Sequence, residues 1–233
     1  MTTFVLVPGV CLGQWYWHPV ARRLQERGFD ALPVTLPGLS YGSRPDGLRL
    51  ADAVDAVGDE LVARDLSDVV LVGHSWGGYP VTGVAHAQRD RIRAVVYYNA
   101  CVPAAGVSFA DENDAIGDHL RETMSSRPDH AVPMTLGDVQ GIMPEASADI
   151  QRLVAELVLP QPGGYLVDAL DLAPVTEVGL PAAYLLGEDD RTLVRPGTEF
   201  AARLGVQPIM IPGGHMSLLT DPEMVTEALI KAI

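Results

Sequence analysis

The stretch Val69-Val70-Leu71-Val72-Gly73-His74-Ser75-Trp76-Gly77-Gly78 joins an apolar run to a serine that glycines flank. The apolar run predicts a buried strand over 69–73, and the residues after the serine predict a helix over 76–89. Gly73, Ser75 and Gly77 form the pattern G-x-S-x-G, in which a sharp strand-to-helix turn lifts the serine hydroxyl clear of the sheet. A glycine-rich connection with an incidental serine is the alternative, and the position between strand and helix disfavours it. We therefore predict that Ser75 is a nucleophile at a helix N-terminus, where the helix dipole favours developing negative charge.

The alternation of short apolar runs with longer amphipathic stretches continues along the chain. It predicts strands at 3–8, 30–36, 69–73, 93–99, 182–187 and 206–211, and helices at 17–27, 50–65, 76–89, 196–204 and 217–231. Such alternation is typical of a mostly parallel sheet that helices cover on both faces. Because 233 residues are enough for one sizeable core and few for two, we expect a single α/β domain spanning 1–233.

One region, residues 103–175, interrupts this alternation. It contains no convincing strand and several short helical patterns. Its prolines include Pro128, Pro133, Pro144, Pro160 and Pro162, and its flexible apolar side chains include Met124, Met134, Ile142 and Met143. An insertion of this kind between two sheet strands predicts a lid over a binding site, with a plain surface excursion as the alternative.

A serine hydroxyl needs a base to become a good nucleophile. Among the six histidines, His215 follows the last predicted strand and precedes the last helix. Its side chain can therefore reach the sheet edge at which Ser75 stands, and we predict that it is the base. An acid must fix the imidazole in its turn, and the run Glu188-Asp189-Asp190 after the preceding strand offers three carboxylates.

Composition limits the partners. The formal net charge of −14 argues against a nucleic-acid partner, and no apolar run approaches the roughly 18 residues of a membrane span. The sequence shows neither metal-ligand motif nor phosphate-binding loop, so we expect no metal, no cofactor and a small-molecule substrate. The start lacks a basic segment before its first strand, which predicts a cytoplasmic protein without a signal peptide. A homodimer is possible.

Several segments together resemble the α/β-hydrolase superfamily, in particular its small branch of plant methyl esterases, hydroxynitrile lyases and related bacterial esterases. The segments that carry the resemblance are the opening Phe4-Val5-Leu6-Val7-Pro8-Gly9-Val10-Cys11-Leu12-Gly13-Gln14-Trp15, the serine turn, Val34 to Gly38, Ala100-Cys101-Val102-Pro103, and Gly214-His215-Met216 with Asp221-Pro222. The resemblance covers nearly everything outside residues 103–175, and it implies the α/β-hydrolase fold with a helical lid.

The resemblance also implies roles for individual residues. It makes Ser75 the nucleophile and His215 the base, and it places the acid three residues after Gly187, at Asp190. The N–H groups of Val10 and Trp76 would form the oxyanion hole. Gly9, Cys11 and Met216 would contact the substrate.

This chain departs from the family pattern at two positions. The family usually has histidine before the oxyanion glycine, where Pro8 stands here, and proline lacks an N–H and fixes φ. Some superfamily members place the acid near Asn99, whose amide cannot serve, which favours Asp190. Hydroxynitrile lyases, in addition, have threonine at the position of Gly9 and lysine at that of Met216.

The two cysteines, Cys11 and Cys101, follow strands that the family's strand order separates by one further strand. That separation is roughly 9–10 Å at ordinary strand spacing, and a disulfide requires Cα atoms within about 7 Å. We expect free thiols.

The function that these expectations favour is hydrolysis of an ester of a small or medium apolar acid through an acyl-enzyme. The lid methionines, with Trp15 or Trp17, would wall an apolar pocket. The alternatives are a non-hydrolytic reaction on the same fold, such as a lyase or a cyclase of secondary metabolism, and a ligand-binding receptor.

Overall fold

The computed structural model describes residues 2–233, and its centre is a six-stranded sheet with the order β10-β9-β4-β3-β1-β2. Every neighbouring pair in this sheet is parallel, as the sequence predicted. The strands are β1 (Thr3–Val7), β2 (Asp30–Pro33), β3 (Val69–Ser75), β4 (Ile92–Ala100), β9 (Ala182–Gly187) and β10 (Ile209–Ile211).

The two edge strands are shorter than predicted, and a proline limits each of them. β2 ends at Pro33, and β10 begins directly after Pro208. Proline has no N–H to contribute to a ladder and fixes φ. The predicted ranges 30–36 and 206–211 therefore each include residues that do not pair in the sheet.

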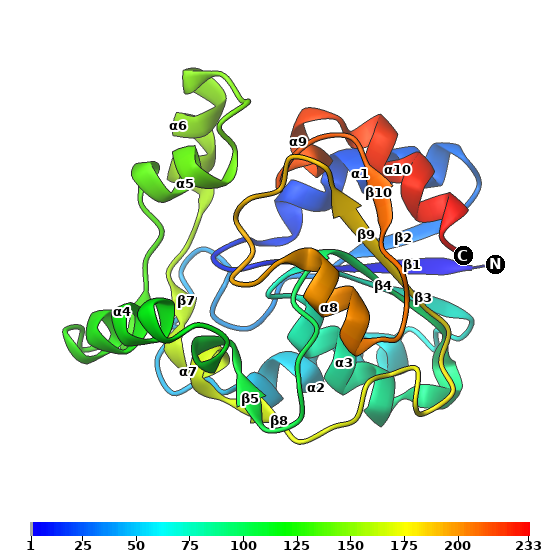
Figure 1. Cartoon of the computed structure of the whole chain (residues 1–233), viewed down its shortest axis with the longest axis horizontal. Coiled ribbons are helices and arrows are strands. Elements are labelled where there is room, and N and C mark those ends of the chain that lie inside the picture. The colour runs from blue at the N-terminus through cyan, green and yellow to red at the C-terminus, as the bar shows by residue number, and fades with distance from the viewer. Residues whose placement is uncertain (1) are drawn as a thin grey trace.

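Helices cover both faces of the sheet (Figure 1). One face carries α1 (His18–Glu26), α9 (Ser217–Thr220) and α10 (Pro222–Lys231), and the other carries α2 (Leu50–Ala63), α3 (Gly78–Ala87) and α8 (Gly197–Arg203). Short 3₁₀ turns complete the set at η1 (Gln14–Trp17), η2 (Arg89–Arg91) and η3 (Phe109–Asp111). The helix predicted over 217–231 is two helices, because Asp221 caps the second by accepting from the Met224 N–H and Pro222 follows it.

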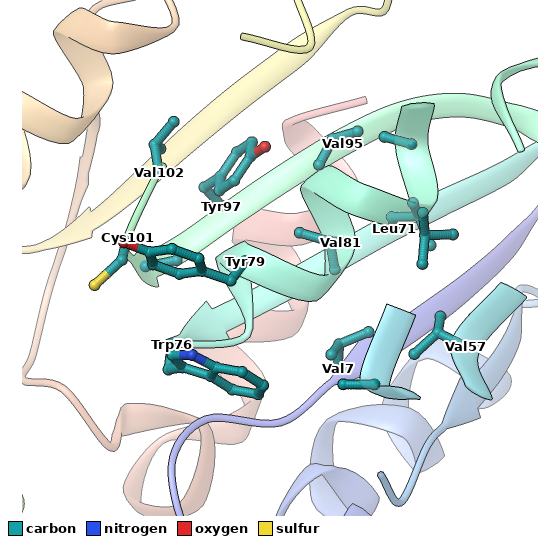
Figure 2. Close-up of a cluster of buried hydrophobic side chains, with 14 of the residues drawn as sticks. Val7, Val57, Leu71, Trp76, Tyr79, Val81, Val95, Tyr97, Cys101 and Val102 are labelled. Carbon is teal, nitrogen blue, oxygen red and sulfur yellow. The ribbon is translucent and has the colours of Figure 1, made fainter. Parts of the chain in front are cut away.

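The core divides into two clusters, one on each face of the sheet. In β1, Val5 and Val7 pack toward α2 and α3, while Phe4 and Leu6 pack toward α1 and α10. Figure 2 shows the first cluster, in which Leu71 of β3 and Tyr97 of β4 lie against α3. Because successive strand side chains point to opposite faces, strands buried on both faces have continuous apolar sequences.

The predicted insertion lies between β4 and β9 and contains four short strands that the sequence did not reveal. Two antiparallel ribbons form its stem, β5 (Val107–Ser108) with β8 (Ala169–Leu170) and β6 (Ala131–Val132) with β7 (Gln161–Pro162). Strands of two residues are too short to produce a hydrophobic period. The helices of the insertion are α4 (Asp114–Ser125), α5 (Leu136–Ile142), α6 (Ala148–Leu157) and α7 (Gly163–Val167), with α5 and α6 at its far end (Figure 1).

A buried carboxylate connects the start of the insertion to α8. The side chain of Glu112 is fully buried and accepts hydrogen bonds from Arg195 Nε at 2.7 Å and Arg203 Nη2 at 2.8 Å. Burial alone would raise the pKa of the Glu112 carboxyl, but the two guanidinium groups hold this pKa below its ordinary value.

Across residues 2–233, no helix has both the length and the apolar character that crossing a membrane requires.

Candidate active site

Ser75 ends β3 in a conformation that few residues adopt. Its φ is +55°, in the left-handed region. The chain then turns so tightly that a Cβ on Gly77 would lie 2.6 Å from the carbonyl oxygen of Pro8, and one on Gly78 would lie 1.8 Å from that of Cys101. Glycine is therefore a steric requirement at both positions, and for Gly77 the G-x-S-x-G pattern predicted this. The serine itself remains partly exposed.

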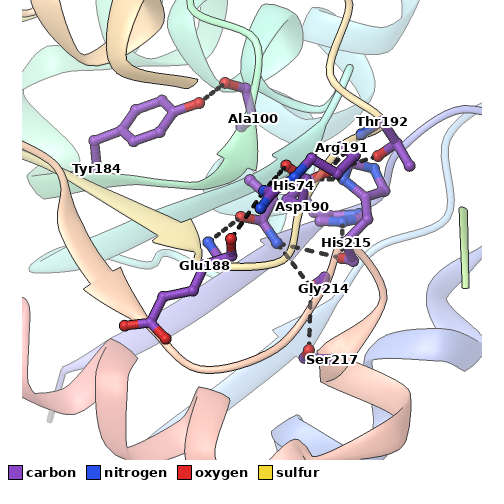
Figure 3. Close-up of polar contacts among 12 residues, drawn as sticks. His74, Ala100, Tyr184, Glu188, Asp190, Arg191, Thr192, Gly214, His215 and Ser217 are labelled. Carbon is purple, nitrogen blue, oxygen red and sulfur yellow. Dashed lines mark hydrogen bonds and ion pairs between the residues drawn. The ribbon is translucent and has the colours of Figure 1, made fainter. Parts of the chain in front are cut away.

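His215 and Asp190 stand on neighbouring strands at the same edge of the sheet. Asp190 follows β9 and His215 follows β10, and the carboxyl ends of parallel strands meet at one edge. His215 Nδ1 lies 2.7 Å from Asp190 Oδ2, and the other carboxylate oxygen accepts from the N–H and the hydroxyl of Thr192 at 2.9 and 2.8 Å (Figure 3). Burial would raise the pKa of Asp190, but His215 and Thr192 together hold it below its ordinary value.

The structure distinguishes the three candidate carboxylates. Glu188 and Asp189 are exposed to solvent, whereas the side chain of Asp190 is fully buried against His215. Only Asp190 is thus placed to orient the imidazole.

Within residues 2–233 no hydrogen bond joins Ser75 to His215, but the residue before Ser75 lies against His215. The imidazole of His74, adjacent to Ser75 in the chain, lies with its ring centre 4.6 Å from that of His215. His215 Nδ1 is occupied by Asp190. Its Nε2 has no hydrogen-bond partner in the described part of the chain and is available for another group.

The loop after β1 contains three successive N–H groups, of which the protein itself uses two. The Gly9 N–H donates to the Tyr16 hydroxyl at 3.1 Å, and the Cys11 N–H donates to Gln161 Oε1 at 2.7 Å. The N–H of Val10, between them, makes no hydrogen bond among residues 2–233. The N–H of Trp76, directly after Ser75, likewise makes no hydrogen bond among residues 2–233.

The three predicted substrate contacts occupy crowded or buried positions. A Cβ on Gly9 would lie 2.9 Å from Ser75 Cβ, so glycine lets this loop pack against the serine turn. Cys11 and Met216 are 1% and 0% exposed. Burial raises the pKa of the Cys11 thiol to about 12, which leaves it protonated. Contact of these residues with a substrate stays a prediction.

Both cysteines are free thiols, as predicted. Their strands, β1 and β4, lie on either side of β3.

A cavity of about 290 Å³ opens beside His215. The insertion contributes Gly141, Ile142, Pro144 and Glu145 to its wall, and the remaining lining residues are Asp189, Arg191, Thr192, Gly213, Gly214 and His215. The expected wall of tryptophan and methionine is absent from this cavity. Trp17 is fully buried, with its indole N–H donating to the Val7 carbonyl, and Met143 is fully buried as well.

Sequence reasoning missed several residues that hold the site together. Asn99, considered only as a non-acid, donates to the Gly214 carbonyl at 3.1 Å and accepts from the Gly187 N–H at 2.7 Å, which connects the loops of base and acid. The signal in the sequence that could have indicated this role is the position of Asn99 near the end of β4. Tyr16 and Gln161 gave none, because their partners are distant in the sequence. Both ring nitrogens of the fully buried His74 make hydrogen bonds.

Within the described range, no group of three or more histidine, cysteine, aspartate or glutamate side chains is arranged to hold a metal ion.

The chain is similar to several known proteins in sequence and in structure. A carbendazim-hydrolyzing esterase of Nocardioides is 37% identical over 111 residues, which are 47% of this chain and 46% of that protein. This chain therefore matches about half the length of that relative. Methylesterase 8 of Arabidopsis thaliana is 27% identical over 82% of this chain and 73% of its own. An extracellular alpha/beta-hydrolase from Paenibacillus, described as sharing structural and functional homology with tobacco salicylic acid binding protein 2, superposes with a TM-score of 0.91 at 23% identity, over 100% of this chain and 99% of its own.

A model of the alpha/beta hydrolase family matches residues 4–228. This match includes the serine turn, the acid loop and the histidine loop, and the strand order places all three at one sheet edge. The chain belongs to the alpha/beta hydrolase family.

Proposed function

We propose that this protein hydrolyses carboxylic esters, with Ser75 as nucleophile, His215 as general base and Asp190 as the acid that orients it. The observation that carries the proposal is the Asp190–His215 pair at 2.7 Å, on the sheet edge where Ser75 stands on a sharp turn. The esterases among its relatives support the same reaction type.

The proposed reaction has two halves. Ser75 Oγ attacks the ester carbonyl while His215 Nε2 takes the hydroxyl proton, and the negative oxygen of the tetrahedral intermediate accepts from the N–H groups of Val10 and Trp76. His215 then gives the proton to the departing alcohol, which leaves an acyl group on Ser75. A water molecule, deprotonated by His215, attacks this acyl group, the bond between the acyl carbon and Ser75 Oγ breaks, and Ser75 Oγ takes the proton back from His215 as the acid is released.

The insertion would serve as the lid of this site. Ile142 and Pro144 face the cavity beside His215, and such side chains suit the apolar part of a small or medium acyl or alcohol group. Met216 carries no charge that could stabilise departing cyanide, which favours ester hydrolysis over cyanohydrin cleavage.

The test is turnover of p-nitrophenyl acetate by the wild type and by Ser75→Ala, with mandelonitrile as a parallel substrate. Removal of a triad member costs about 10⁴-fold or more. Retention of about a tenth of the activity by Ser75→Ala would contradict the nucleophile. Cyanide release from mandelonitrile faster than hydrolysis of any ester would contradict the reaction type.

A further inference from the structure

A chain of buried hydrogen bonds runs beneath the proposed site. It begins with the Gly9 N–H and the Tyr16 hydroxyl at 3.1 Å, continues from this hydroxyl to His74 Nδ1 at 2.9 Å, and ends with His74 Nε2 and the His215 carbonyl oxygen at 3.0 Å. Tyr16 and His74 are both 0% exposed, so water does not compete for these bonds.

The direction of every bond in this chain follows from its last member. A carbonyl oxygen only accepts, so His74 Nε2 carries the hydrogen that it donates to His215. Burial and the adjacent His215 hold the pKa of His74 well below its usual range, so its Nδ1 is an acceptor. The Tyr16 hydroxyl therefore donates to Nδ1 and accepts from the Gly9 N–H. Each donor in the chain has one acceptor, and the His215 carbonyl oxygen also accepts a longer bond from Asn99 Nδ2 at 3.5 Å.

Each end of the chain adjoins a different part of the proposed machinery. Gly9 directly precedes Val10, the proposed oxyanion donor, and His74 directly precedes Ser75. The far end is the backbone of the base itself, and Gly213, at φ +91°, and Gly214 precede it. Since two glycines leave that loop little stiffness of its own, an anchor at the His215 carbonyl has a large effect on where the imidazole lies.

We propose that Tyr16 and His74 are positioning residues, which fix the oxyanion loop and the base loop relative to Ser75 through this one chain. The inference rests on the proposed function. Neither side chain touches the reacting atoms. Both act by setting the distance between the oxyanion donors and the base, and an error of about 1 Å in such a distance can cost about 100-fold in rate.

The first test compares Tyr16→Phe with Tyr97→Phe. Both tyrosines are fully buried, and the Tyr97 hydroxyl bonds to Thr82 at 2.7 Å on the other face of the sheet. Tyr16→Phe should lower kcat for p-nitrophenyl acetate by about 10- to 100-fold and leave KM within a small factor, while Tyr97→Phe retains wild-type kcat. An unchanged kcat in Tyr16→Phe, or an equal loss in both variants, would overturn the proposal.

The second test examines the chain without any substrate. Hydrogen exchange of the Gly9 amide should quicken in Tyr16→Phe and stay slow in Tyr97→Phe, because only the first variant loses its acceptor. Unchanged Gly9 exchange would overturn the chain even if esters are hydrolysed. Absence of Ser75-dependent ester turnover would instead refute the proposed function. The Gly9 exchange rate would still test whether the hydrogen-bond chain exists.

The third test is rescue at position 74. His74→Gln keeps one acceptor and one donor on a planar group, whereas His74→Leu keeps neither. We expect His74→Gln to retain at least about ten times the kcat of His74→Leu, with similar KM. If both variants fold and are equally active, the role of His74 is overturned. If His74→Leu does not fold, His74→Gln is compared with Tyr16→Phe instead. His74→Gln should then have the higher kcat, and an equal or lower kcat would overturn the role of His74.

Discussion

At the scale of single residues, the proposed acid differs from the neighbouring carboxylates in what its two oxygens contact. Asp190 uses one oxygen for His215 Nδ1 and the other for the N–H and hydroxyl of Thr192. Both oxygens are therefore fixed in direction, and the imidazole must keep its hydrogen on Nδ1. This tautomer leaves the Nε2 lone pair for the nucleophile.

Asp190→Asn tests this assignment. An amide N–H facing Nδ1 would favour the tautomer with its hydrogen on Nε2, which cannot accept a proton from Ser75, so kcat should fall about 10⁴-fold. The matched control is Asp189→Asn, whose side chain is exposed and whose kcat should stay near that of the wild type. Ester hydrolysis and circular dichroism of both variants provide the measurement, and a larger loss in Asp189→Asn would refute the assignment.

The sequence predicted where Ser75 and His215 lie relative to the sheet, because that location follows from the local pattern along the chain. Ser75 lies between a strand and a helix, and His215 lies in the loop after the last strand, so local pattern was enough. Tyr16 and Gln161 act on residues brought close only by the tertiary fold, and a single sequence carries no periodic signal for such contacts. Asn99 is an intermediate case. The sequence predicted its position at the end of a strand but not its contacts with Gly187 and Gly214.

At the scale of elements, the stem of the insertion holds the loop after β1 that contains the proposed oxyanion donor Val10. Gln161 of β7 accepts from the Cys11 N–H at 2.7 Å, the Leu159 N–H donates to the Cys11 carbonyl at 3.0 Å, and Cys11 Sγ lies 3.4 Å from the Val132 carbonyl. Cys11 itself has a φ of +64°. Any movement of the β6–β7 ribbon would therefore move the residue next to Val10.

Gln161→Met should lower kcat for an ester by about tenfold, because the Cys11 N–H loses its acceptor and the loop is less well fixed. The fold should survive, since the amide nitrogen of Gln161 is buried without a hydrogen-bond partner among residues 2–233 and its removal offsets part of the loss. Gln151→Met is the matched control, because Gln151 is also buried in the insertion but donates to the Met143 carbonyl instead. Equal kcat in wild type and Gln161→Met would contradict the coupling.

At the scale of the whole molecule, the two edges of the sheet show what sequence pattern misses. The sequence predicted all six strands of the sheet, because runs buried on both faces leave a strong signal. The ends of β2 and β10 were overextended, because Pro33 and Pro208 stop pairing in ways that an apolar run does not reveal. The ribbons of the insertion were missed because two residues do not make a pattern.

Glu112 couples the insertion to the rest of the molecule and makes stability depend on pH. Because its pKa is lowered in the folded state, its contribution is complete above the unfolded pKa of about 4.3 and is lost as pH falls through the folded pKa. Arg195 and Arg203 are 39% and 23% exposed, so Glu112→Gln should lower the free energy of unfolding at pH 7 by about 2–3 kcal/mol rather than the larger value of a fully buried pair.

Denaturant unfolding at pH 7 and under acid conditions measures this effect. The difference between wild type and Glu112→Gln should shrink as the pH is lowered through the folded pKa. Glu199→Gln is the control, because Glu199 is 55% exposed and lies 3.7 Å from the same Arg195, and its unfolding should follow that of the wild type. A difference that grows toward acid would show that the sign is wrong.

The backbone at Ser75 also limits how the nucleophile could change in evolution. A φ of +55° is unfavourable for side chains that branch at Cβ. Cysteine and aspartate are unbranched there, and both serve as nucleophiles in other enzymes. Threonine has the same hydroxyl as serine but adds a methyl group at the branch. Descendants of this protein could therefore replace oxygen by sulfur or by a carboxylate more easily than they could gain that one methyl group.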